Sequence, residues 1–249
     1  MTNFNPFSLE GKTILVTGSS SGIGRGIAII CSKMGAKVII NGRNVSKLEE
    51  TSTMMIDDSA IMMPGDLTDY MSLVPKVASL PKLDGVVHCA GMGQRKPCKE
   101  LQKDDVEQIM SVNFEAPVML QAELLRQKKI NKGASIVFIA SIASWSPSFG
   151  NSIYSASKGA IISYSNCLAL ELAPRQIRVN CISPAMVWTD LVFSDVTDKK
   201  LLEEDEKRYP LKRYGRPEDI ANLVVYMLSD ASTWMTGSNV KISGGGKLS

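Results

Sequence analysis

The segment Thr17-Gly18-Ser19-Ser20-Ser21-Gly22-Ile23-Gly24 follows a short apolar run and leads directly into a pattern of helical spacing. A pyrophosphate binds well at such a junction, because backbone N–H groups and the helix dipole favour negative charge and a Cβ would obstruct the approach. The hydroxyls of Ser20 and Ser21 add donors near the phosphates. A plain glycine-rich turn is the alternative interpretation. We predict that the following residues hold a dinucleotide: Gly18, Ser20, Ser21, Gly22, Ile23 and Gly24.

The rest of the chain alternates strand-length apolar runs with stretches of helix length. The predicted strands are Thr13–Thr17, Lys37–Ile40, Gly85–His88, Ser135–Ala140, Arg178–Ile182 and Asn239–Ile242, with Ala60–Met63 as a weaker candidate. The predicted helices are Ile23–Met34, Asp104–Lys128, Ser155–Ala173 and Pro217–Ser229. Continuous apolar runs suit strands that are buried on both faces of a parallel sheet. We therefore predict an α/β protein with a doubly wound, Rossmann-like fold, its central parallel sheet having about seven strands, in a single domain over residues 1–249.

Composition and charge exclude several classes of function. The formal net charge is +3, and Lys and Arg are too scattered to form a nucleic-acid footprint. No apolar run approaches the roughly 20 residues that span a bilayer, and the first residues do not resemble a secretory signal. The five cysteines lack C-x-x-C spacing and His88 is the only histidine, so we expect reduced thiols and no metal site. We expect a cytoplasmic protein with neither nucleic acid nor membrane as a partner.

Three residues form a candidate reacting centre. Tyr154 and Lys158 are four residues apart in a helical pattern, which places both on one helix face. A phenol with a pKa near about 10 is a poor acid–base group at neutral pH, and we expect the nearby ammonium to lower that pKa. Ser141 lies 13 residues before Tyr154 and just beyond a predicted strand, at the edge where ligands bind in such sheets. Its hydroxyl is suited to hold a substrate oxygen while Tyr154 gives or takes the proton.

The end of the second strand indicates which nicotinamide cofactor is used. An NAD-type site usually has a carboxylate there to accept from the ribose hydroxyls, but this chain has Gly42 at that place, followed by Arg43 and Asn44. No carboxylate repels a 2′-phosphate, and a guanidinium is available to bind one. The alternative is that Arg43 is a solvated loop residue. We predict NADP(H), with Arg43 and Asn44 among the cofactor ligands.

Together these motifs resemble the short-chain dehydrogenase/reductase family over nearly the whole chain. The resemblance implies an oxidoreductase that moves hydride between the nicotinamide and a ketone or secondary alcohol, with Tyr154 as general acid/base. It implies that Asn113 holds a water in a proton relay with Lys158, and that both Tyr154 and Lys158 also contact the cofactor. For Asp66, which matches a position that meets the adenine, a turn or N-cap role is the alternative. Further cofactor contacts implied by the resemblance are Asp66, Leu67, Cys89, Ala90, Gly91, Pro184, Val187 and Thr189.

Three positions depart from the family pattern. His88-Cys89-Ala90-Gly91 stands where the family usually has Asn-Asn-Ala-Gly, and we interpret His88 as a packed residue rather than a catalytic one. Ala185 follows Pro184 where the family has glycine, which would cost about 1 kcal/mol if that backbone needs a positive φ. Ser21 stands where some NADP-using relatives have a basic residue, which leaves Arg43 as the chief discriminator.

The substrate side is less defined by the sequence. We expect a lid at about residues 190–213, with a surface excursion as the alternative. Pocket walls are expected from Ile142, Trp145, Ser146, Phe149 and Trp188. The small-molecule substrate stays open among 3-oxoacyl thioesters, steroid ketones, sugar-like ketones and cyclic diketones. Lys132 and Arg175 would serve an acidic carrier protein if the first of these applies.

Alternative functions remain at this point. One is a 3-oxoacyl-[acyl-carrier-protein] reductase specifically, another is a dinucleotide-sensing protein without catalysis, and a third is an epimerase or dehydratase of the same fold. The resemblance also implies a homo-oligomer, commonly a tetramer. Its interfaces would be Asp104–Lys128, Ser155–Ala173 and the C-terminal strand.

Overall fold

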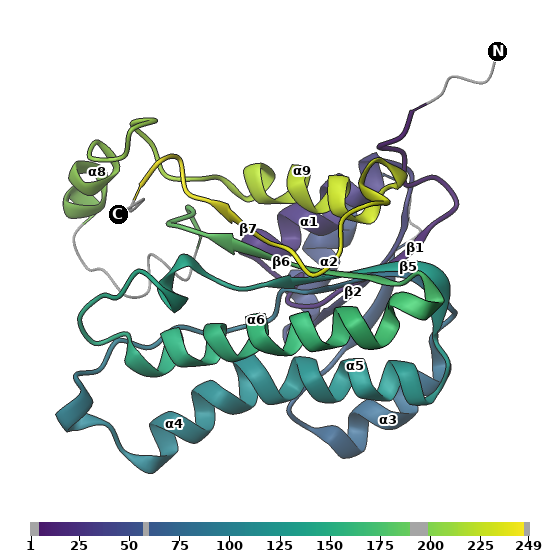
Figure 1. The fold of residues 1–249 in the computed structure, drawn as a ribbon, viewed down its shortest axis with the longest axis horizontal. Helices are drawn as coiled ribbons and strands as arrows, with labels where there is room; N and C mark the ends of the chain where they lie inside the picture. Colours follow the sequence, from purple (N-terminus) through teal and green to yellow (C-terminus); the bar gives the residue numbers. More distant parts are fainter. Residues whose placement is uncertain (1–4, 57–59, 190–198, 247–249) are drawn as a thin grey trace.

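The computed structural model of the chain describes residues 5–56, 60–189 and 199–246. Within these residues, seven parallel strands form one sheet in the order β3-β2-β1-β4-β5-β6-β7 (Figure 1). From β1 the chain adds β2 and β3 on one side of the sheet. It then crosses to the other side of β1 and adds β4 to β7, so the direction of winding reverses once between β1 and β4, as in a doubly wound fold. The predicted fold class is therefore confirmed. The strands are β1 (Thr13–Val16), β2 (Lys37–Gly42), β3 (Ile61–Pro64), β4 (Leu83–His88), β5 (Ile130–Ile139), β6 (Arg178–Pro184) and β7 (Asn239–Ile242).

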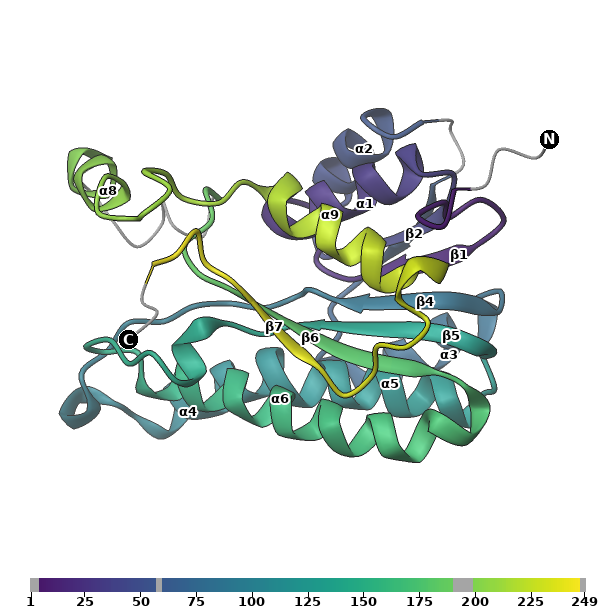
Figure 2. The same ribbon diagram turned by 45° about the horizontal axis from the view of Figure 1, so that its top comes forward.

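Helices cover both faces of the sheet, as Figures 1 and 2 show. One face carries α1 (Gly22–Lys33), α2 (Val45–Thr53) and α9 (Pro217–Leu228). The other carries α3 (Tyr70–Ser79), α4 (Lys103–Met110), α5 (Ala116–Arg126) and α6 (Ser152–Leu172). The short helix α8 (Lys199–Glu206) lies beyond the carboxyl ends of the strands. Short 3-10 turns occur at Cys98–Glu100, Ile142–Ser144, Ala173–Arg175 and Asp230–Ser232.

Alternate residues of one strand pack into two separate cores. Ile14 and Val16 of β1 belong to the cluster under α1 and α9, whereas Leu15 belongs to the cluster under α5 and α6. All three are fully buried. Each such side chain contributes about 1.5–3 kcal/mol of burial. This is why the strand reads as a continuous apolar run instead of an alternating one.

The long helix predicted over Asp104–Lys128 is interrupted in the structure. A π-turn, Ser111–Glu115, separates α4 from α5, and Pro117 lies in the first turn of α5. Proline has no N–H to donate to the carbonyl four residues earlier, which here belongs to Asn113. A regular helix therefore cannot continue through this point. The interruption places Asn113 at a local change of helix geometry.

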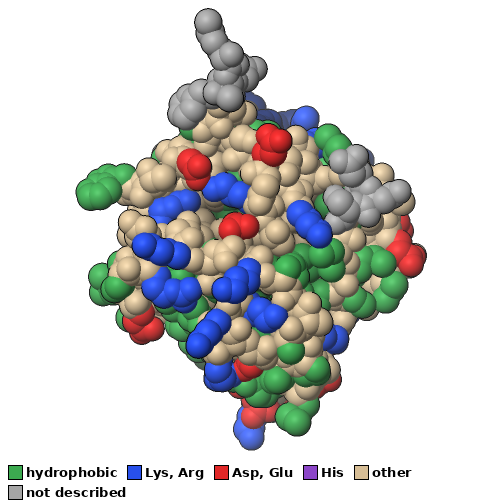
Figure 3. All heavy atoms as spheres, turned by 90° about the vertical axis from the view of Figure 1, so that its right-hand side faces the viewer, with side chains coloured by type: hydrophobic (Ala, Val, Ile, Leu, Met, Phe, Trp, Pro, Cys, Tyr) green, Lys and Arg blue, Asp and Glu red, His purple; other side chains and the backbone are tan. Residues whose placement is uncertain are grey.

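Basic side chains gather on the face shown in Figure 3, which is the right-hand side of Figure 1. The helices that flank the sheet have their carboxyl ends at this face, near the amino ends of the strands. Lys33, Arg126 and Arg175 lie in the last turns of α1, α5 and the 3-10 turn Ala173–Arg175. Cations at these positions are favoured by the negative end of the helix dipole. The gathering thus has a structural cause, and it lies opposite the carboxyl ends of the strands.

Among the described helices, none is long and apolar enough to cross a bilayer. The part of the chain that the structure describes also holds no group of three or more His, Cys, Asp or Glu side chains placed to bind a metal ion.

Candidate active site

The loops at the carboxyl ends of the strands enclose a cavity of about 570 Å³. It is lined by the turns after β1, β2, β3, β4, β5 and β6, together with the start of α6. A cavity at this edge is expected for an open parallel sheet, because the connecting loops diverge where the strand order reverses. All the predicted site residues line it except Asn44 and Asn113.

The glycine turn after β1 has no room for side chains at its critical points. Gly18 has φ +68°, and a Cβ there would lie 2.8 Å from Cα of Ala90. A Cβ on Gly24 would overlap the carbonyl oxygen of Gly18. Ser21 begins α1 without capping it through its side chain, and the first turn holds no acidic residue. The N-terminus of α1 therefore presents its backbone N–H groups to the cavity, which fits a pyrophosphate.

Several residues that the sequence analysis missed hold this turn in place. The hydroxyl of Thr17 accepts from the backbone N–H groups of Cys89 (3.0 Å) and Ala90 (3.1 Å). Arg25 donates from Nη2 to the carbonyl of Ser20 at 2.6 Å and forms an ion pair with Glu50 at 3.0 Å. These contacts connect the turn to β4 and α2. No local pattern shows the contacts of Thr17 with Cys89 and Ala90 or of Arg25 with Glu50, because these join segments that are distant in the sequence.

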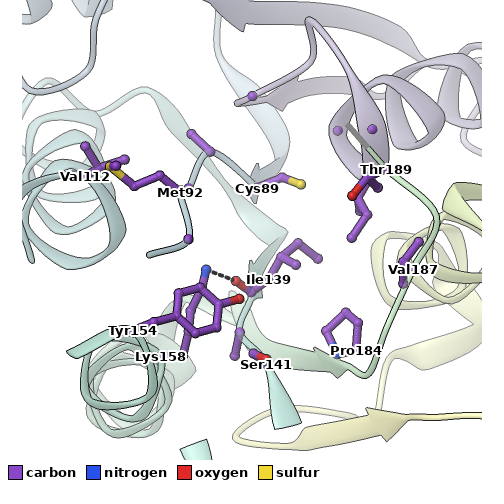
Figure 4. A pocket seen from close by; sticks show the side chains of 18 of the residues that line it. Cys89, Met92, Val112, Ile139, Ser141, Tyr154, Lys158, Pro184, Val187 and Thr189 are labelled. Carbon is purple, nitrogen blue, oxygen red and sulfur yellow. Dashed lines mark hydrogen bonds between the residues drawn. The ribbon is translucent and has the colours of Figure 1, made fainter. Parts of the chain in front are cut away.

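The predicted reacting centre is assembled on one side of the cavity. Tyr154 and Lys158 come from the first turns of α6, and Ser141 follows β5 (Figure 4). The Lys158 ammonium donates to the carbonyl of Ile139 at 2.9 Å and lies 5.8 Å from the centre of the Tyr154 ring. Across the cavity from these side chains lie Pro184, Val187 and Thr189. These last three were predicted as cofactor contacts, and they line the cavity.

The protonation of the reacting centre differs from the sequence-based expectation. Burial raises the pKa of Tyr154, and the hydrogen bond with Ser141 opposes that rise without cancelling it. Burial also lowers the pKa of Lys158. The expected lowering of the Tyr154 pKa is not found in this structure, because burial of the phenol raises its pKa and outweighs the opposing hydrogen bond with Ser141. The raised pKa favours the neutral phenol of Tyr154 over the phenolate at neutral pH.

Asn113 is buried beside this centre and does not line the cavity. Its Oδ1 accepts from the N–H of Met92 at 2.8 Å, and its Nδ2 donates to the carbonyl of Met92 at 2.9 Å and to Ser157 at 3.1 Å. A Cβ on Gly91 would lie 3.2 Å from Asn113 Oδ1 and 3.4 Å from Lys158 Nζ. The side chain thus holds the loop after β4 against α6, close to Lys158. Because Pro117 has no N–H, the backbone carbonyl of Asn113 receives no hydrogen bond from the residue four positions later.

The far end of the cavity, after β2, contains Arg43, the residue predicted to distinguish the two nicotinamide cofactors. Arg43 is largely exposed, and its nearest acidic partner is Asp66 at 3.7 Å. A Cβ on Gly42 would come within 3.1 Å of Ser20, so this position has little space for a carboxylate side chain. Asn44 instead caps α2 by accepting from the N–H of Lys47 at 3.0 Å.

Asp66 has the turn role that the sequence analysis gave as an alternative, and its predicted contact with the adenine stays a prediction. Its carboxylate accepts from the backbone N–H of Thr68 at 2.9 Å and from the Thr68 hydroxyl at 2.8 Å. These bonds lower the pKa of Asp66, with the backbone bond as the largest cause. The residue therefore stabilises a turn, and it lines the cavity as well.

The structure explains three residues that depart from the family pattern, namely His88, Cys89 and Ala185. His88 is buried, stacks on Phe138 with ring centres 4.5 Å apart, and lies 3.0 Å from the Gln121 side-chain oxygen. Burial lowers the pKa of His88 to about 4, so it is a neutral packed residue. Cys89 lines the cavity, and burial raises the pKa of its thiol to about 12. Ala185 does not have a positive φ, so the alanine causes no strain there.

The expected substrate walls are only partly correct. Ile142 and Ser146 line the cavity, whereas Trp145, Phe149 and Trp188 do not. Trp145 packs under the Lys241 ammonium, 4.4 Å from its ring centre. Trp188 donates to Glu206 at 2.9 Å. The exposed Phe149 ring is not part of the wall, and the polar residues that take these places are Gln94, Arg95, Gln108, Ser148 and Asn151.

The predicted lid falls partly on residues 190–198, which lie outside the described part of the chain. Its later portion is α8 and the segment after it. There Leu202 packs with Tyr209 and Tyr214, and Leu201 is exposed. Tyr209 also lines the cavity, so this segment closes part of the substrate side.

Known proteins resemble the chain over almost its full length. The family model described as "Enoyl-(Acyl carrier protein) reductase" matches residues 18–247. A 3-oxoacyl-[acyl-carrier-protein] reductase from Rickettsia bellii is 35% identical, covering 95% of this chain and 97% of the relative. A tropinone reductase homolog from Arabidopsis thaliana is 34% identical, covering 96% and 93%.

Solved structures agree with this similarity. A putative gluconate dehydrogenase from Agrobacterium tumefaciens superposes with a TM-score of 0.91 at 29% identity, covering 99% of both chains. A protein from Brucella melitensis, titled short-chain dehydrogenase/reductase SDR:Glucose/ribitol dehydrogenase, gives a TM-score of 0.91 at 28% identity, covering 98% of this chain and all of that one. These relatives are named for different substrates, but each is named as a reductase or a dehydrogenase.

Proposed function

The chain belongs to the short-chain dehydrogenase/reductase family of oxidoreductases, and from this premise we propose that it is an NADP(H)-dependent carbonyl reductase acting on a ketone. The observation that carries the proposal is the convergence of Ser141, Tyr154 and Lys158 on one cavity, which the glycine turn also lines. A non-catalytic sensor would have no use for this geometry. An epimerase or dehydratase is not favoured by any observation here.

The residues present fit the cofactor. The compact turn Gly18–Gly24 and the uncapped start of α1 would hold the pyrophosphate, and Arg43 would bind the 2′-phosphate. Lys158 would hold the nicotinamide ribose, with Pro184, Val187 and Thr189 on the opposite wall. When bound, the nicotinamide supplies or accepts the hydride.

The side chains of the cavity account for the proton transfer. The Ser141 hydroxyl donates a hydrogen bond to the substrate oxygen and fixes it beside the Tyr154 hydroxyl. Tyr154 then gives its proton to that oxygen as the carbonyl carbon is reduced. The tyrosinate that forms is stabilised by the Lys158 ammonium, whose position is set by its bond to the Ile139 carbonyl. The Lys158 ammonium then returns a proton to Tyr154, and Lys158 regains its own proton from solvent through a water that the Asn113 carbonyl would hold.

The raised pKa of Tyr154 keeps the phenol in the protonated form that ketone reduction requires. Reduction needs the neutral phenol, which is the form that predominates at neutral pH when burial raises the pKa. Oxidation of an alcohol needs the phenolate, which forms only at higher pH. We propose that the protein is able to catalyse ketone reduction near neutral pH.

The cofactor proposal is tested by kinetics with NADPH and NADH. We expect kcat/KM to favour NADPH, and Arg43→Ala to reduce that preference by about tenfold through loss of a charge-assisted contact. Lys37→Ala is the matched control, because Lys37 begins β2 whereas Arg43 follows its end. A preference for NADH, or equal effects of the two substitutions, would overturn the choice of NADP(H).

A narrower candidate is a 3-oxoacyl-[acyl-carrier-protein] reductase. Several relatives at 30–35% identity carry this name. Lys132 and Arg175, suggested for contact with a carrier protein, lie at the amino ends of β5 and β6, opposite the cavity of their own chain. Comparing kcat/KM for acetoacetyl carrier protein and acetoacetyl-N-acetylcysteamine tests this candidate, since a carrier-specific enzyme must prefer the former.

We further propose that the protein is a cytoplasmic homotetramer whose interfaces involve α4, α5, α6 and β7. Exposed apolar side chains such as Leu170 on α6 and Trp234 before β7 support this proposal. Light scattering coupled to size-exclusion chromatography gives the mass. A monomeric mass at micromolar concentration would contradict the tetramer.

A further inference from the structure

One charged residue lines the substrate side of the cavity without a role in the proton transfer. Arg95 follows β4 in the loop Gln94-Arg95-Lys96, and both Gln94 and Arg95 line the cavity. The same side is lined by the hydroxyl-bearing Ser146 and Ser148. This wall is therefore polar and carries a positive charge, in contrast to the aromatic wall expected from the sequence.

The loop around Arg95 is fixed by a single carboxylate. Asp105 of α4 accepts from Gln94 at 2.6 Å, from Lys96 at 2.5 Å and from the backbone N–H of Gln102 at 2.7 Å. These bonds lower the pKa of Asp105, with the Lys96 bond as the largest cause. The residues on both sides of Arg95 are thus held by one anchor, and the charge of that anchor is already balanced by Lys96.

Arg95 itself has no such partner. Within residues 5–56, 60–189 and 199–246, no hydrogen bond or ion pair is found for its guanidinium, and the side chain is exposed. Arg25, Arg126, Arg178 and Arg213 all donate to protein groups. A guanidinium on a cavity wall, in a fixed loop and with no internal acceptor, is suited to bind an anion that enters from outside.

The topology separates Arg95 from the site proposed for the 2′-phosphate of the cofactor. The backbone of Arg95 and Lys96 runs beside Gly150, in the loop after β5, with the N–H of Lys96 donating to the Gly150 carbonyl at 2.8 Å. Arg43 follows β2, and two strands, β1 and β4, lie between β2 and β5. At about 4.8 Å per strand, the two loops are on the order of 14 Å apart. The 2′-phosphate at Arg43 is therefore not the anion that Arg95 meets, and the contact with Gly150 places this loop beside the segment that follows Ser141.

We propose that Arg95 is a specificity-determining residue that binds an anionic group of the carbonyl substrate, a carboxylate or a phosphate, so that the substrate class is an acidic ketone. This inference rests on the proposed reductase function. The substrate ketone lies at Ser141 and Tyr154, and its anionic end extends toward the loop Gln94-Arg95-Lys96. Ser148 and Gln94 add neutral hydrogen-bonding groups at that end.

The test compares matched ketones that differ only in charge. Acetoacetate and levulinate are assayed with NADPH against their methyl esters, and dihydroxyacetone phosphate against dihydroxyacetone. We expect kcat/KM to be about tenfold or more higher for the anion in at least one pair, a size typical of a charge-assisted hydrogen bond. The pair with the larger ratio tells whether the group is a carboxylate or a phosphate.

Two variants assign the effect to Arg95. Arg95→Gln is expected to remove the advantage of the anion, to raise its KM by about tenfold, and to leave the neutral ketone and the KM for NADPH unchanged. Lys99→Gln is the control, because Lys99 is exposed on the same connection but does not line the cavity. Added salt should raise the KM of the anion in the parent protein and not in Arg95→Gln.

The outcomes separate this inference from the proposed function. If neutral and anionic ketones are reduced equally well, or if both variants behave alike, the role of Arg95 is wrong while the reductase function stands. If none of these ketones oxidises NADPH, the proposed function fails for them and the inference fails with it.

Discussion

Lowering the pH is expected to destabilise the protein through His88. The imidazole is buried in the core face of β4, stacked on Phe138, and its only hydrogen-bond partner among the described residues is the side chain of Gln121. Burial lowers its pKa in the folded protein from 6.5 to about 4. The unfolded chain therefore binds a proton that the folded protein excludes when the pH lies between these two values. The stability that depends on neutral His88 is present above about pH 6.5 and is lost as the pH falls toward about 4.

The size of this effect follows from the two pKa values. A shift of one pKa unit corresponds to about 1.4 kcal/mol, so the full difference is on the order of 3 kcal/mol. Between about pH 7 and about pH 5, the expected loss in the free energy of unfolding is about 2 kcal/mol. Carboxylates also contribute as the pH falls, so the effect of His88 is obtained as a difference between two proteins.

The assay is urea unfolding followed by tryptophan fluorescence, at about pH 7 and about pH 5, for the parent protein and His88→Asn. Asparagine keeps a hydrogen-bonding group near Gln121 but does not titrate. We expect the loss of stability between the two pH values to be about 2 kcal/mol smaller in the variant. An equal loss in both proteins would refute the assignment, because another group would then carry the titration.

Three further predictions concern the site. Gly24→Ala places a methyl group against the carbonyl of Gly18, so NADPH binding measured by fluorescence titration should weaken by about tenfold or more, and an unchanged Kd would contradict the compact turn. Ser141→Ala removes a donor to the substrate oxygen and should lower kcat by about 100-fold, whereas the KM for NADPH should stay the same; a loss in cofactor affinity would instead indicate a structural role. The raised pKa of Tyr154 predicts that ketone reduction declines only as the pH passes the ordinary value of 10.0, whereas alcohol oxidation rises with pH; a decline of reduction near neutral pH would be inconsistent with a protonated phenol.

The strands and the fold class could be predicted because the strands share one sequence pattern with one cause. A strand covered on both faces must be apolar throughout, and such runs are easy to recognise in β1, β4 and β6. The helices α2 and α3 were missed for local reasons. The segment Val45–Thr53 is mostly polar, and Tyr70–Ser79 contains Pro75, a residue that usually argues against a helix.

The predicted site residues that line the cavity are brought there by backbone position. Ser141 follows a strand and Tyr154 lies in the first turn of a helix, so the sheet edge brings both to one cavity. The walls could not be predicted in this way, because nearness in sequence to Ser141 does not determine which side a residue faces. Trp145 leaves the 3-10 turn after β5 toward Lys241, and Arg95 reaches the cavity from a loop with no recognisable pattern.

The protonation of Tyr154 shows a limit of reasoning from spacing alone. The four-residue interval correctly placed Lys158 near Tyr154, but it said nothing about solvent. Removing water from the phenol raises its pKa more than its neighbours lower it. The opposing effects could be weighed only once the depth of the cavity was known.

The proposed role of Tyr154 as the general acid is tested most directly by the turnover of Tyr154→Phe with NADPH and a ketone that the parent protein reduces. The substitution removes one oxygen and leaves the ring that packs in the cavity, so the fold and NADPH binding should be retained. We expect kcat to fall by at least about 100-fold with an unchanged Kd for NADPH, as expected for loss of a general acid. Near-normal turnover in this variant would contradict the proposed mechanism, even though the fold and the family would stand.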